Sequence, residues 1–165
     1  MMVVVVMGVA GSGKSTVGPL IAEALGGDYA EGDQFHPPAN IAKMSSGQPL
    51  DDVDRQPWLE AMARAIRDWR GRERPTVLAC SALKQRYREI LSGGSHEVHF
   101  VYIKGSPALI AGRIGARKGH FMPTTLLDSQ FRTLEEPGPG DAIVVDAAQP
   151  PAVIAAAAVL ALRAS

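Results

Sequence analysis

The chain has 165 residues, of which 46% are hydrophobic, and its 17 lysines and arginines balance its 17 aspartates and glutamates. A chain of this length can bury roughly two-thirds of the surface that its unfolded form exposes, which favours one folded domain over residues 1–165. The absence of net charge argues against a general attraction to nucleic acid or to an anionic membrane, so an anionic ligand must be bound by local geometry.

Apolar segments rich in valine and isoleucine alternate with helical patterns along the chain. The first segment is interrupted at Gly8 and has no basic residue ahead of it, so we expect a buried strand and not a signal peptide or a membrane span. Strands are expected at 3–7, around 29–30, and at 76–80, 98–103 and 143–145, and helices at 14–25, 57–70, 83–91, 107–117, 124–134 and 151–162. Fully apolar strands separated by helices predict an α/β fold, in which helices cover both faces of a parallel sheet.

Two segments, 32–56 and 118–123, do not fit this alternation. Long insertions in a compact α/β domain usually serve function, and ligands bind at the carboxyl ends of parallel strands, where both segments are expected. In the first segment, the prolines of GDQFHPP are expected to prevent the chain from continuing as a helix. Pro57, Pro107 and Pro151 are expected in first helical turns, where a missing N–H costs nothing.

The segment GVAGSGKS, residues 8–15, matches the phosphate-binding pattern G-x-x-x-x-G-K-[ST] between an expected strand and an expected helix. Gly8, Gly11 and Gly13 would let backbone N–H groups face phosphate oxygens, and the helix N-terminus adds partial positive charge. Lys14 would reach the β- and γ-phosphates, and the Ser15 hydroxyl would bind Mg²⁺. The alternative is a glycine-rich turn that matches by coincidence, which the strand and helix context disfavours.

This pattern predicts nucleotide binding but does not identify a kinase, because GTPases, ATPase motors and nucleotide-sensing modules share it. The sequence contains no N-K-x-D segment, and its D-x-x-G at 68–71 is expected at the end of a helix and not after a strand. These two features disfavour a guanine-nucleotide switch.

The segment GRIGARKGHF, residues 112–121, gathers positive charge. It places Arg113 and Arg117 four residues apart on one helical face, followed by Lys118 and His120. A lid at about 117–124 could bring these cations to the charge that develops on a transferred phosphoryl group. The alternatives are a solvated basic helix end and a histidine that only hydrogen-bonds the lid itself.

Taken together, several segments resemble the gluconate kinase (gluconokinase) family over essentially the whole chain from 7 to 150: GVAGSGKST, GDQFHPPANIAKMSSGQPLDDVDRQPWL, CSALKQRYREIL, ARKGHFM, QFRTLEEP and VVD. The second segment makes the resemblance specific, because P-loop proteins do not generally share it. The resemblance implies a P-loop three-layer sandwich with a five-stranded parallel sheet, as in shikimate and nucleoside-monophosphate kinases. It also implies ATP with Mg²⁺, phosphorylation of D-gluconate at its terminal hydroxyl to 6-phosphogluconate, and often a homodimer.

In kinases of this kind, an aspartate after the second strand contacts the acceptor hydroxyl, and Asp33 matches that position. Asp33 is expected to orient the hydroxyl or to act as its general base, although it could instead cap the following turn. His36 could donate to a hydroxyl or to the carboxylate of the sugar acid, or could only pack on the loop. Pro37 and Pro38 would stiffen this loop and so reduce the entropy lost on binding.

The carboxylate of gluconate requires a cation, and the candidates are Lys43, Arg55, Lys84 and Arg88. Arg55 is favoured because an arginine at the start of a helix gains nothing from the helix dipole. Lys84 and Arg88 are four residues apart and are expected on one helical face, which could equally be an exposed basic face.

The remaining predicted contacts rest on less specific signals. Ser81 could bind a ligand or cap the next helix. The resemblance makes Gln130 and Glu135 ligand or lid contacts, and Arg113 is expected to stack on adenine near the turn at 149–150. The predicted nucleotide-binding residues are Gly8, Gly11, Ser12, Gly13, Lys14, Ser15, Thr16, Arg113 and Arg117.

For the metal, Asp146 is too late in the chain to be the usual acidic ligand. This leaves Mg²⁺ with Ser15, the phosphates and water, and with Asp33 as a further candidate. Cys80, the single cysteine, cannot form an intrachain disulfide, which favours a structural thiol and a reducing cytoplasm.

Two other functions remain open at this stage. The chain could be a shikimate or nucleoside-monophosphate kinase, although a nucleotide acceptor would need cations for its own phosphate. It could also be a nucleotide-sensing module without turnover, which the presence of Lys14, Ser15 and Asp33 disfavours.

Overall fold

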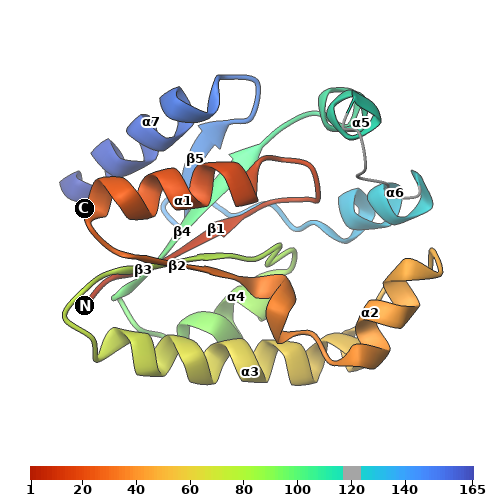
Figure 1. Ribbon diagram of the computed structural model, residues 1–165, viewed down its shortest axis with the longest axis horizontal. Helices are drawn as coiled ribbons and strands as arrows, with labels where there is room; N and C mark the ends of the chain where they lie inside the picture. Colours follow the sequence, from red (N-terminus) through yellow and green to blue (C-terminus); the bar gives the residue numbers. More distant parts are fainter. Residues whose placement is uncertain (117–123) are drawn as a thin grey trace.

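Figure 1 shows the computed structural model of the chain, which describes residues 1–116 and 124–165. Its centre is a parallel sheet of five strands in the order β2-β3-β1-β4-β5. The strands are β1 (Val3–Met7), β2 (Asp28–Glu31), β3 (Thr76–Ala79), β4 (Val98–Lys104) and β5 (Ile143–Asp146). They confirm the five strands predicted from the sequence, with small shifts at the ends.

Helices connect the strands and cover both faces of the sheet. In the described residues they are α1 (Lys14–Leu25), the 3₁₀ turn η1 (Gly32–Phe35), α2 (Pro38–Ser45), α3 (Asp52–Arg70), α4 (Gln85–Ser92), α5 (Pro107–Ala116), α6 (Thr124–Thr133) and α7 (Pro151–Ala164). Helices α1 and α7 lie on one face, and α3 and α4 lie on the other (Figure 1). None of these helices is both long enough and apolar enough to span a bilayer. The three layers confirm the predicted α/β fold class.

Strand β1 shows why a continuous run of valines suits this sheet. Successive side chains of a strand point to opposite faces. Val4 and Val6 therefore pack with α1 and α7, whereas Val3 and Val5 pack with α3 and α4. All four side chains are fully buried, as expected for a central strand covered on both faces.

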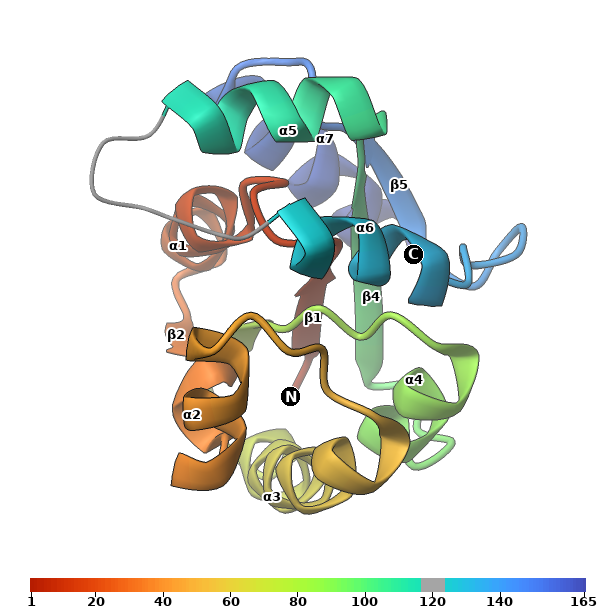
Figure 2. The ribbon, with the colours of Figure 1, turned by 90° about the vertical axis from the view of Figure 1, so that its right-hand side faces the viewer.

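The functional edge of the sheet is the one at which the parallel strands end. The loop after β1, the turn η1 after β2 and Ser81 after β3 emerge there close together, because these three strands are neighbours. Figure 2 views this side of the molecule and shows α2, α5 and α6 around the strand ends.

The segment 32–56 contains helical structure that the sequence analysis did not predict. The turn η1 ends at Phe35, and α2 begins at Pro38. Pro37 is the N-cap of α2 and Pro38 is its first residue, where a backbone N–H is not needed. The expectation that the prolines prevent the chain from continuing as a helix holds for η1, which ends before them, but the chain starts a new helix at Pro38.

Helix α3 begins well before its predicted start at 57. Its N-cap is Asp51, whose side chain accepts from the Asp54 N–H at 2.8 Å, while the Asp54 side chain accepts from the Asp51 N–H at 3.0 Å. This reciprocal capping box starts the helix. The prediction that Pro57 lies in the first turn is wrong, because Pro57 lies inside α3, whereas Pro107 and Pro151 do open α5 and α7.

Candidate active site

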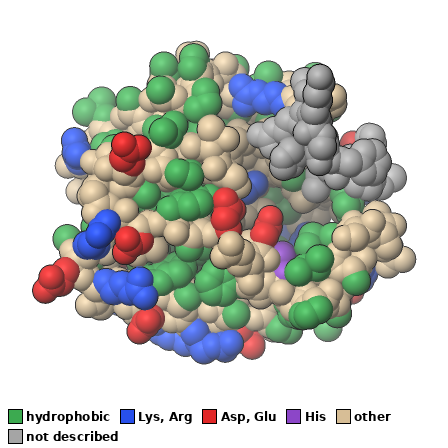
Figure 3. Space-filling model, viewed as in Figure 1, with side chains coloured by type: hydrophobic (Ala, Val, Ile, Leu, Met, Phe, Trp, Pro, Cys, Tyr) green, Lys and Arg blue, Asp and Glu red, His purple; other side chains and the backbone are tan. Residues whose placement is uncertain are grey.

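A cleft of about 420 Å³ opens at the carboxyl edge of the sheet, bounded by the loop after β1, η1, α2, α3 and α6. Figure 3 shows acidic side chains and a histidine beside a hollow in the face that it draws. The predicted site residues that line the cleft are Gly11, Lys14, Ser15, Asp33, His36, Arg55, Ser81 and Gln130. The fold therefore brings together predicted residues that are far apart in the sequence.

The loop between β1 and α1 forms a cradle of backbone. Gly13 is the N-cap of α1 with a φ of 106°, and no side chain caps the first turn. A Cβ on Gly8 would lie only 2.8 Å from the Ser12 Oγ, so a side chain at Gly8 would press into the loop. The Ser12 hydroxyl is buried and has no hydrogen-bond partner among the described residues, which is unusual for a polar group. The uncapped helix end and the buried hydroxyl both fit a bound phosphate.

Lys14, Ser15 and Thr16 begin helix α1, and the first two of them line the cleft. The Lys14 Nζ donates to the carbonyl oxygens of Gly8 and Val9, each at 2.9 Å, which holds the ammonium over the loop. Ser15 and Thr16 are exposed on the first turn of the helix. Lys14 and Ser15 therefore line one wall of the cleft together.

Glu31 is a carboxylate of the cleft that the sequence analysis missed. It ends β2, where its Oε1 accepts from the Tyr29 hydroxyl at 2.6 Å and its Oε2 accepts from the Ser15 hydroxyl at 3.2 Å. Burial and the hydrogen bond to Glu31 raise the pKa of Tyr29, so this phenol remains a donor. The signal in the sequence was the acidic pair Glu31 and Asp33 at the end of one strand.

The turn η1 brings Asp33 and His36 to the cleft. Trp58 of α3 holds this turn, because its Nε1 donates to the Gly32 carbonyl at 2.8 Å. The His36 ring stacks on Trp58, with ring centroids 4.2 Å apart and planes 11° apart. This burial lowers the pKa of His36 below its ordinary 6.5, with the Asp33 charge acting in the opposite direction. His36 is therefore mostly neutral at pH 7, and the Asp33 side chain beside it is exposed.

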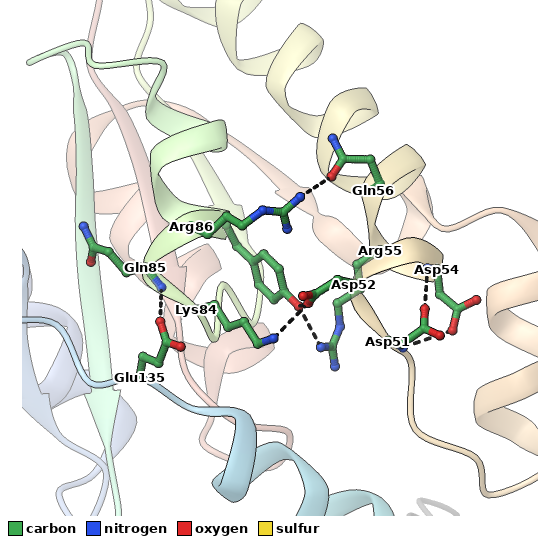
Figure 4. Close-up of polar contacts among 10 residues, drawn as sticks. Asp51, Asp52, Asp54, Arg55, Gln56, Lys84, Gln85, Arg86 and Glu135 are labelled. Carbon is green, nitrogen blue, oxygen red and sulfur yellow. Dashed lines mark hydrogen bonds and ion pairs between the residues drawn. The ribbon is translucent and has the colours of Figure 1, made fainter.

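Arg55 is held at the cleft by a chain of polar contacts between α3 and α4 (Figure 4). Its Nη1 donates to the Tyr87 hydroxyl at 3.0 Å, and that hydroxyl donates to Asp52. Asp52 also forms an ion pair with Lys84, with 2.9 Å between Oδ1 and Nζ. Hydrogen bonds from Tyr87 and Lys84 lower the pKa of Asp52, so its carboxylate is ionised at neutral pH. Arg55 is only 8% exposed, yet it lines the cleft.

Lys43 and Lys84 do not line the cleft, although both were candidates for binding a carboxylate. The Nζ of Lys43 lies 2.7 Å from the Oδ2 of Asp54, the second residue of the α3 capping box. Lys84 pairs with Asp52 and so supports the chain of contacts that ends at Arg55. Both lysines therefore stabilise the first turn of α3, which carries Arg55.

Arg88 is buried in the protein, 4% exposed, and also does not line the cleft. Its Nη1 donates to the Ala82 carbonyl at 2.7 Å, and its Nη2 donates to the Glu135 carbonyl at 2.8 Å. The expectation that Lys84 and Arg88 lie on one helical face is wrong, because Lys84 is the N-cap that precedes α4, and the alternative of an exposed basic face is wrong as well, because Arg88 is buried. The Glu135 carboxylate accepts from the Gln85 N–H at 3.0 Å and so caps α4.

Ser81 and Gln130 lie in the cleft at the end of β3 and on α6. The Gln130 Oε1 accepts from the Ala10 N–H at 2.7 Å, which ties α6 to the phosphate-binding loop. Gln130 thus contacts the phosphate-binding loop and also lines the cleft.

The other predicted residues lie away from the cleft or outside the described residues. Arg113 is half-buried on α5 and does not line the cleft. Asp146 ends the edge strand β5, and its carboxylate accepts from the Ala148 N–H at 2.9 Å. Arg117, His120 and nearly all of the predicted lid fall at 117–123, outside the described residues.

The fold and the cleft define the class of protein. A phosphate-binding loop between the first strand and the first helix, facing a second set of polar groups at the same sheet edge, is the arrangement of a P-loop kinase. The shikimate kinase family model matches residues 10–136 of the chain.

Comparison with known proteins narrows this class. The chain is 46% identical over 148 residues to the thermoresistant gluconokinase of Escherichia coli K12, covering 88% of this chain and 85% of that protein. It is 49% identical over 140 residues to a gluconokinase of Gluconobacter oxydans, covering 85% and 79%. The crystal structure of a gluconokinase from Sinorhizobium meliloti 1021 aligns with a TM-score of 0.90 at 47% identity, covering 99% of this chain and 92% of that one. The chain therefore belongs to the shikimate kinase family and, within it, to the gluconokinases.

Proposed function

We propose that this protein transfers the γ-phosphoryl group of ATP to the terminal hydroxyl of D-gluconate, giving 6-phospho-D-gluconate and ADP. The observation that carries the proposal is one cleft in which Lys14 and Ser15 of the phosphate-binding loop face Asp33, His36 and Arg55. The relatives named as gluconokinases, which align over most of the chain, support the choice of acceptor.

The nucleotide half of the reaction rests on the phosphate-binding loop. Its backbone N–H groups and Lys14 hold the β- and γ-phosphates. Charge spreads over the oxygens of the transferred group in a loose transition state, and donors that are already in place stabilise it without reorganising. We assign Arg117 as a second cation for this charge and Arg113 as the residue that stacks on adenine.

The acceptor half rests on Asp33 and Arg55. Asp33 orients the terminal hydroxyl toward the phosphorus atom, and because a loose transition state needs little early proton removal, orientation is its larger contribution. Arg55 offers a planar guanidinium to the gluconate carboxylate. Arg55 would then hold the carboxylate at one end of gluconate, and Asp33 would hold the reactive hydroxyl at the other end. His36, Ser81 and Gln130 would act as donors or acceptors between these two ends.

The oxygen donors near Ser15 fit a hard divalent cation. Ser15 already hydrogen-bonds the Glu31 carboxylate at 3.2 Å, and Asp33 lines the same cleft. Ser15 would hold Mg²⁺ directly, with Glu31 at the end of β2 and Asp33 in η1 as further oxygen donors. When bound with the nucleotide, Mg²⁺ neutralises charge on the β- and γ-phosphate oxygens.

We further propose that residues 1–165 form one kinase domain in which the segment 32–56 binds the acceptor and the segment 117–124 is the lid. The cytoplasmic location inferred from the single cysteine and the homodimer implied by the family resemblance remain predictions.

The substrate is tested by steady-state assays of ADP release with gluconate, shikimate and the nucleoside monophosphates as acceptors. We expect turnover with gluconate and background rates with the others.

Lys14→Ala is expected to abolish turnover while circular dichroism shows an intact fold. Asp33→Asn is expected to lower kcat far more than it lowers the affinity for ATP, since it removes the group that orients the hydroxyl.

Each part of the proposal has its own contrary result. Turnover of another acceptor, with none of gluconate, would exclude gluconate as the substrate. Tight ATP binding without transfer to any acceptor would indicate a nucleotide-sensing module. A near-normal kcat for Asp33→Asn would make the role of that carboxylate structural.

A further inference from the structure

Asn40 is a buried polar side chain that connects three elements near the cleft. It lies on α2 and is 5% exposed. Its Nδ2 lies 2.8 Å from the backbone oxygen of Asp54 in α3 and 3.2 Å from the Nδ1 of His36, which follows η1. One amide nitrogen thus contacts both the first turn of α3 and a histidine of the cleft.

These two contacts determine which ring nitrogen of His36 carries a proton. A carbonyl oxygen can only accept, so the amide atom that faces Asp54 is the NH₂ group, which has two hydrogens to donate and no capacity to accept. The same NH₂ group faces the Nδ1 of His36, and Nδ1 must therefore accept. A neutral imidazole that accepts at Nδ1 carries its proton on Nε2.

The surroundings of His36 favour this neutral state. The stacked Trp58 restrains the plane of the ring and shields one of its faces from water. A second proton would have to be added at Nδ1, where the hydrogens of Asn40 already point. Arg55 also disfavours a positive charge on the ring, whereas Asp33 favours one. Because His36 lines the cleft, the ring can offer it a neutral N–H donor.

We propose that Asn40 is a positioning residue that fixes His36 as a neutral Nε2–H donor toward a hydroxyl oxygen of the acceptor. The identity of the acceptor rests on the proposed function. A neutral donor suits a row of hydroxyl groups and leaves the charged contact to Arg55. If Asn40 had only a structural role, it would tie α2 to α3 through the Asp54 carbonyl and would not affect the tautomer.

Nuclear magnetic resonance tests the tautomer directly in the substrate-free protein. Long-range ¹H–¹⁵N correlation spectra of the imidazole rings at pH 7 distinguish Nδ1–H, Nε2–H and doubly protonated rings, and loss of one set of peaks in His36→Gln assigns His36. We expect the Nε2–H pattern. In Asn40→Asp, a carboxylate that can only accept replaces the NH₂ group, so the proton is expected to move to Nδ1 or a second proton to bind there, while His96 and His99 serve as internal controls.

Kinetics test whether Asn40 acts through His36. Asn40→Ala is expected to raise the KM for gluconate about tenfold, the loss of about one hydrogen bond, while kcat and the KM for ATP stay within about twofold. In a His36→Ala background, the same change is expected to have no further effect on this KM. His36→Gln places an amide nitrogen near the position of Nε2 and is expected to keep the KM within about threefold, whereas His36→Asn is expected to raise it about tenfold.

An Nδ1–H ring or an imidazolium in the wild-type protein at pH 7 would overturn the proposal. So would an equal rise in the KM for gluconate when Asn40→Ala is added to the wild-type and to the His36→Ala protein, since a structural tie gives the same cost in both. A wild-type protein that does not phosphorylate gluconate would refute the proposed function instead. In that case the tautomers of the substrate-free wild-type and Asn40→Asp proteins would still decide whether Asn40 controls His36.

Discussion

The position of the Arg55 side chain is determined by its hydrogen-bond partners. The Tyr87 hydroxyl has one proton, and it donates that proton to Asp52, so it can only accept from Arg55. The ion pair of Asp52 with Lys84 keeps the carboxylate in place. Each group in this series of contacts can donate or accept in only one way. The contacts therefore hold the guanidinium of Arg55 at the wall of the cleft.

Removal of the Tyr87 hydroxyl is expected to weaken acceptor binding without weakening nucleotide binding. Tyr87→Phe keeps the ring, over which the Arg55 guanidinium lies 5.5 Å from the centroid, but leaves Nη1 of Arg55 without its acceptor. A hydrogen bond that involves a charged group contributes about 1.5 kcal/mol or more, so the KM for gluconate should rise about tenfold while the KM for ATP is unchanged. Steady-state kinetics with each substrate varied in turn measures both constants.

Tyr102→Phe is the matched control for this prediction. Tyr102 is another buried tyrosine, on β4, and it does not line the cleft. Its variant is expected to keep both KM values. If Tyr87→Phe and Tyr102→Phe have the same kinetics, the hydrogen bonds that link Asp52 to Arg55 through Tyr87 do not position the guanidinium for the acceptor.

At the scale of residues, the sequence predicted local patterns better than distant partners. The phosphate-binding loop could be identified because its glycines, Lys14 and Ser15 are neighbours in the chain. Arg55 and Arg88 were both candidate ligands, and the position of Arg55 at the start of a helix favoured it, but nothing near Arg88 in the sequence shows that it binds the carbonyl oxygens of Ala82 and Glu135 and does not line the cleft. That distinction depends on tertiary contacts.

At the scale of elements, the residues that start α3 can be found in the sequence, but Pro57 led to a predicted start that is too late. Pro57 suggested a first turn, because proline is common there. The capping box of Asp51 and Asp54 lies earlier and satisfies backbone donors that otherwise lack a partner. The same neglect of N-terminal preferences hid α2, since the preference of proline for the first helical turn was not applied to Pro37 and Pro38.

Loss of this cap is expected to destabilise the protein. Asp51→Ala removes the side chain that accepts from the Asp54 N–H, and the free energy of unfolding should fall by about 1 kcal/mol. Urea denaturation followed by circular dichroism measures the change. Val53→Ala in the same first turn is the control, since Val53 is 81% exposed and should change stability by no more than about 0.5 kcal/mol. Equal effects of the two variants would show that the capping box does not stabilise α3.

At the scale of the whole molecule, the sheet separates two apolar clusters, one under α1 and α7 and the other under α3 and α4. This arrangement was predictable, because fully apolar strands between helices leave few alternatives to a covered parallel sheet. The second cluster also supports the cleft, since α3 contributes both its buried residues and Arg55.

Leu59 in this second cluster is fully buried, and its truncation is expected to lower the stability of the whole domain. Leu59→Ala should reduce the free energy of unfolding by about 2–5 kcal/mol, because it removes buried methyl groups and leaves a cavity. Leu160→Ala on α7, where the side chain is 74% exposed, should change it by no more than about 0.5 kcal/mol. Urea midpoints that shift equally in the two variants would contradict the assignment of Leu59 to the core.

The order of the strands also places the nucleotide-binding loop and the acceptor-binding segment at different positions in the sheet. The nucleotide loop follows β1 in the middle of the sheet, whereas the segment 32–56 follows β2 at its margin. A lineage could therefore exchange one small-molecule acceptor for another by altering a peripheral segment while its central phosphate machinery stayed intact. For the same reason, this segment is the natural one to exchange in engineering a phosphotransferase for a new alcohol.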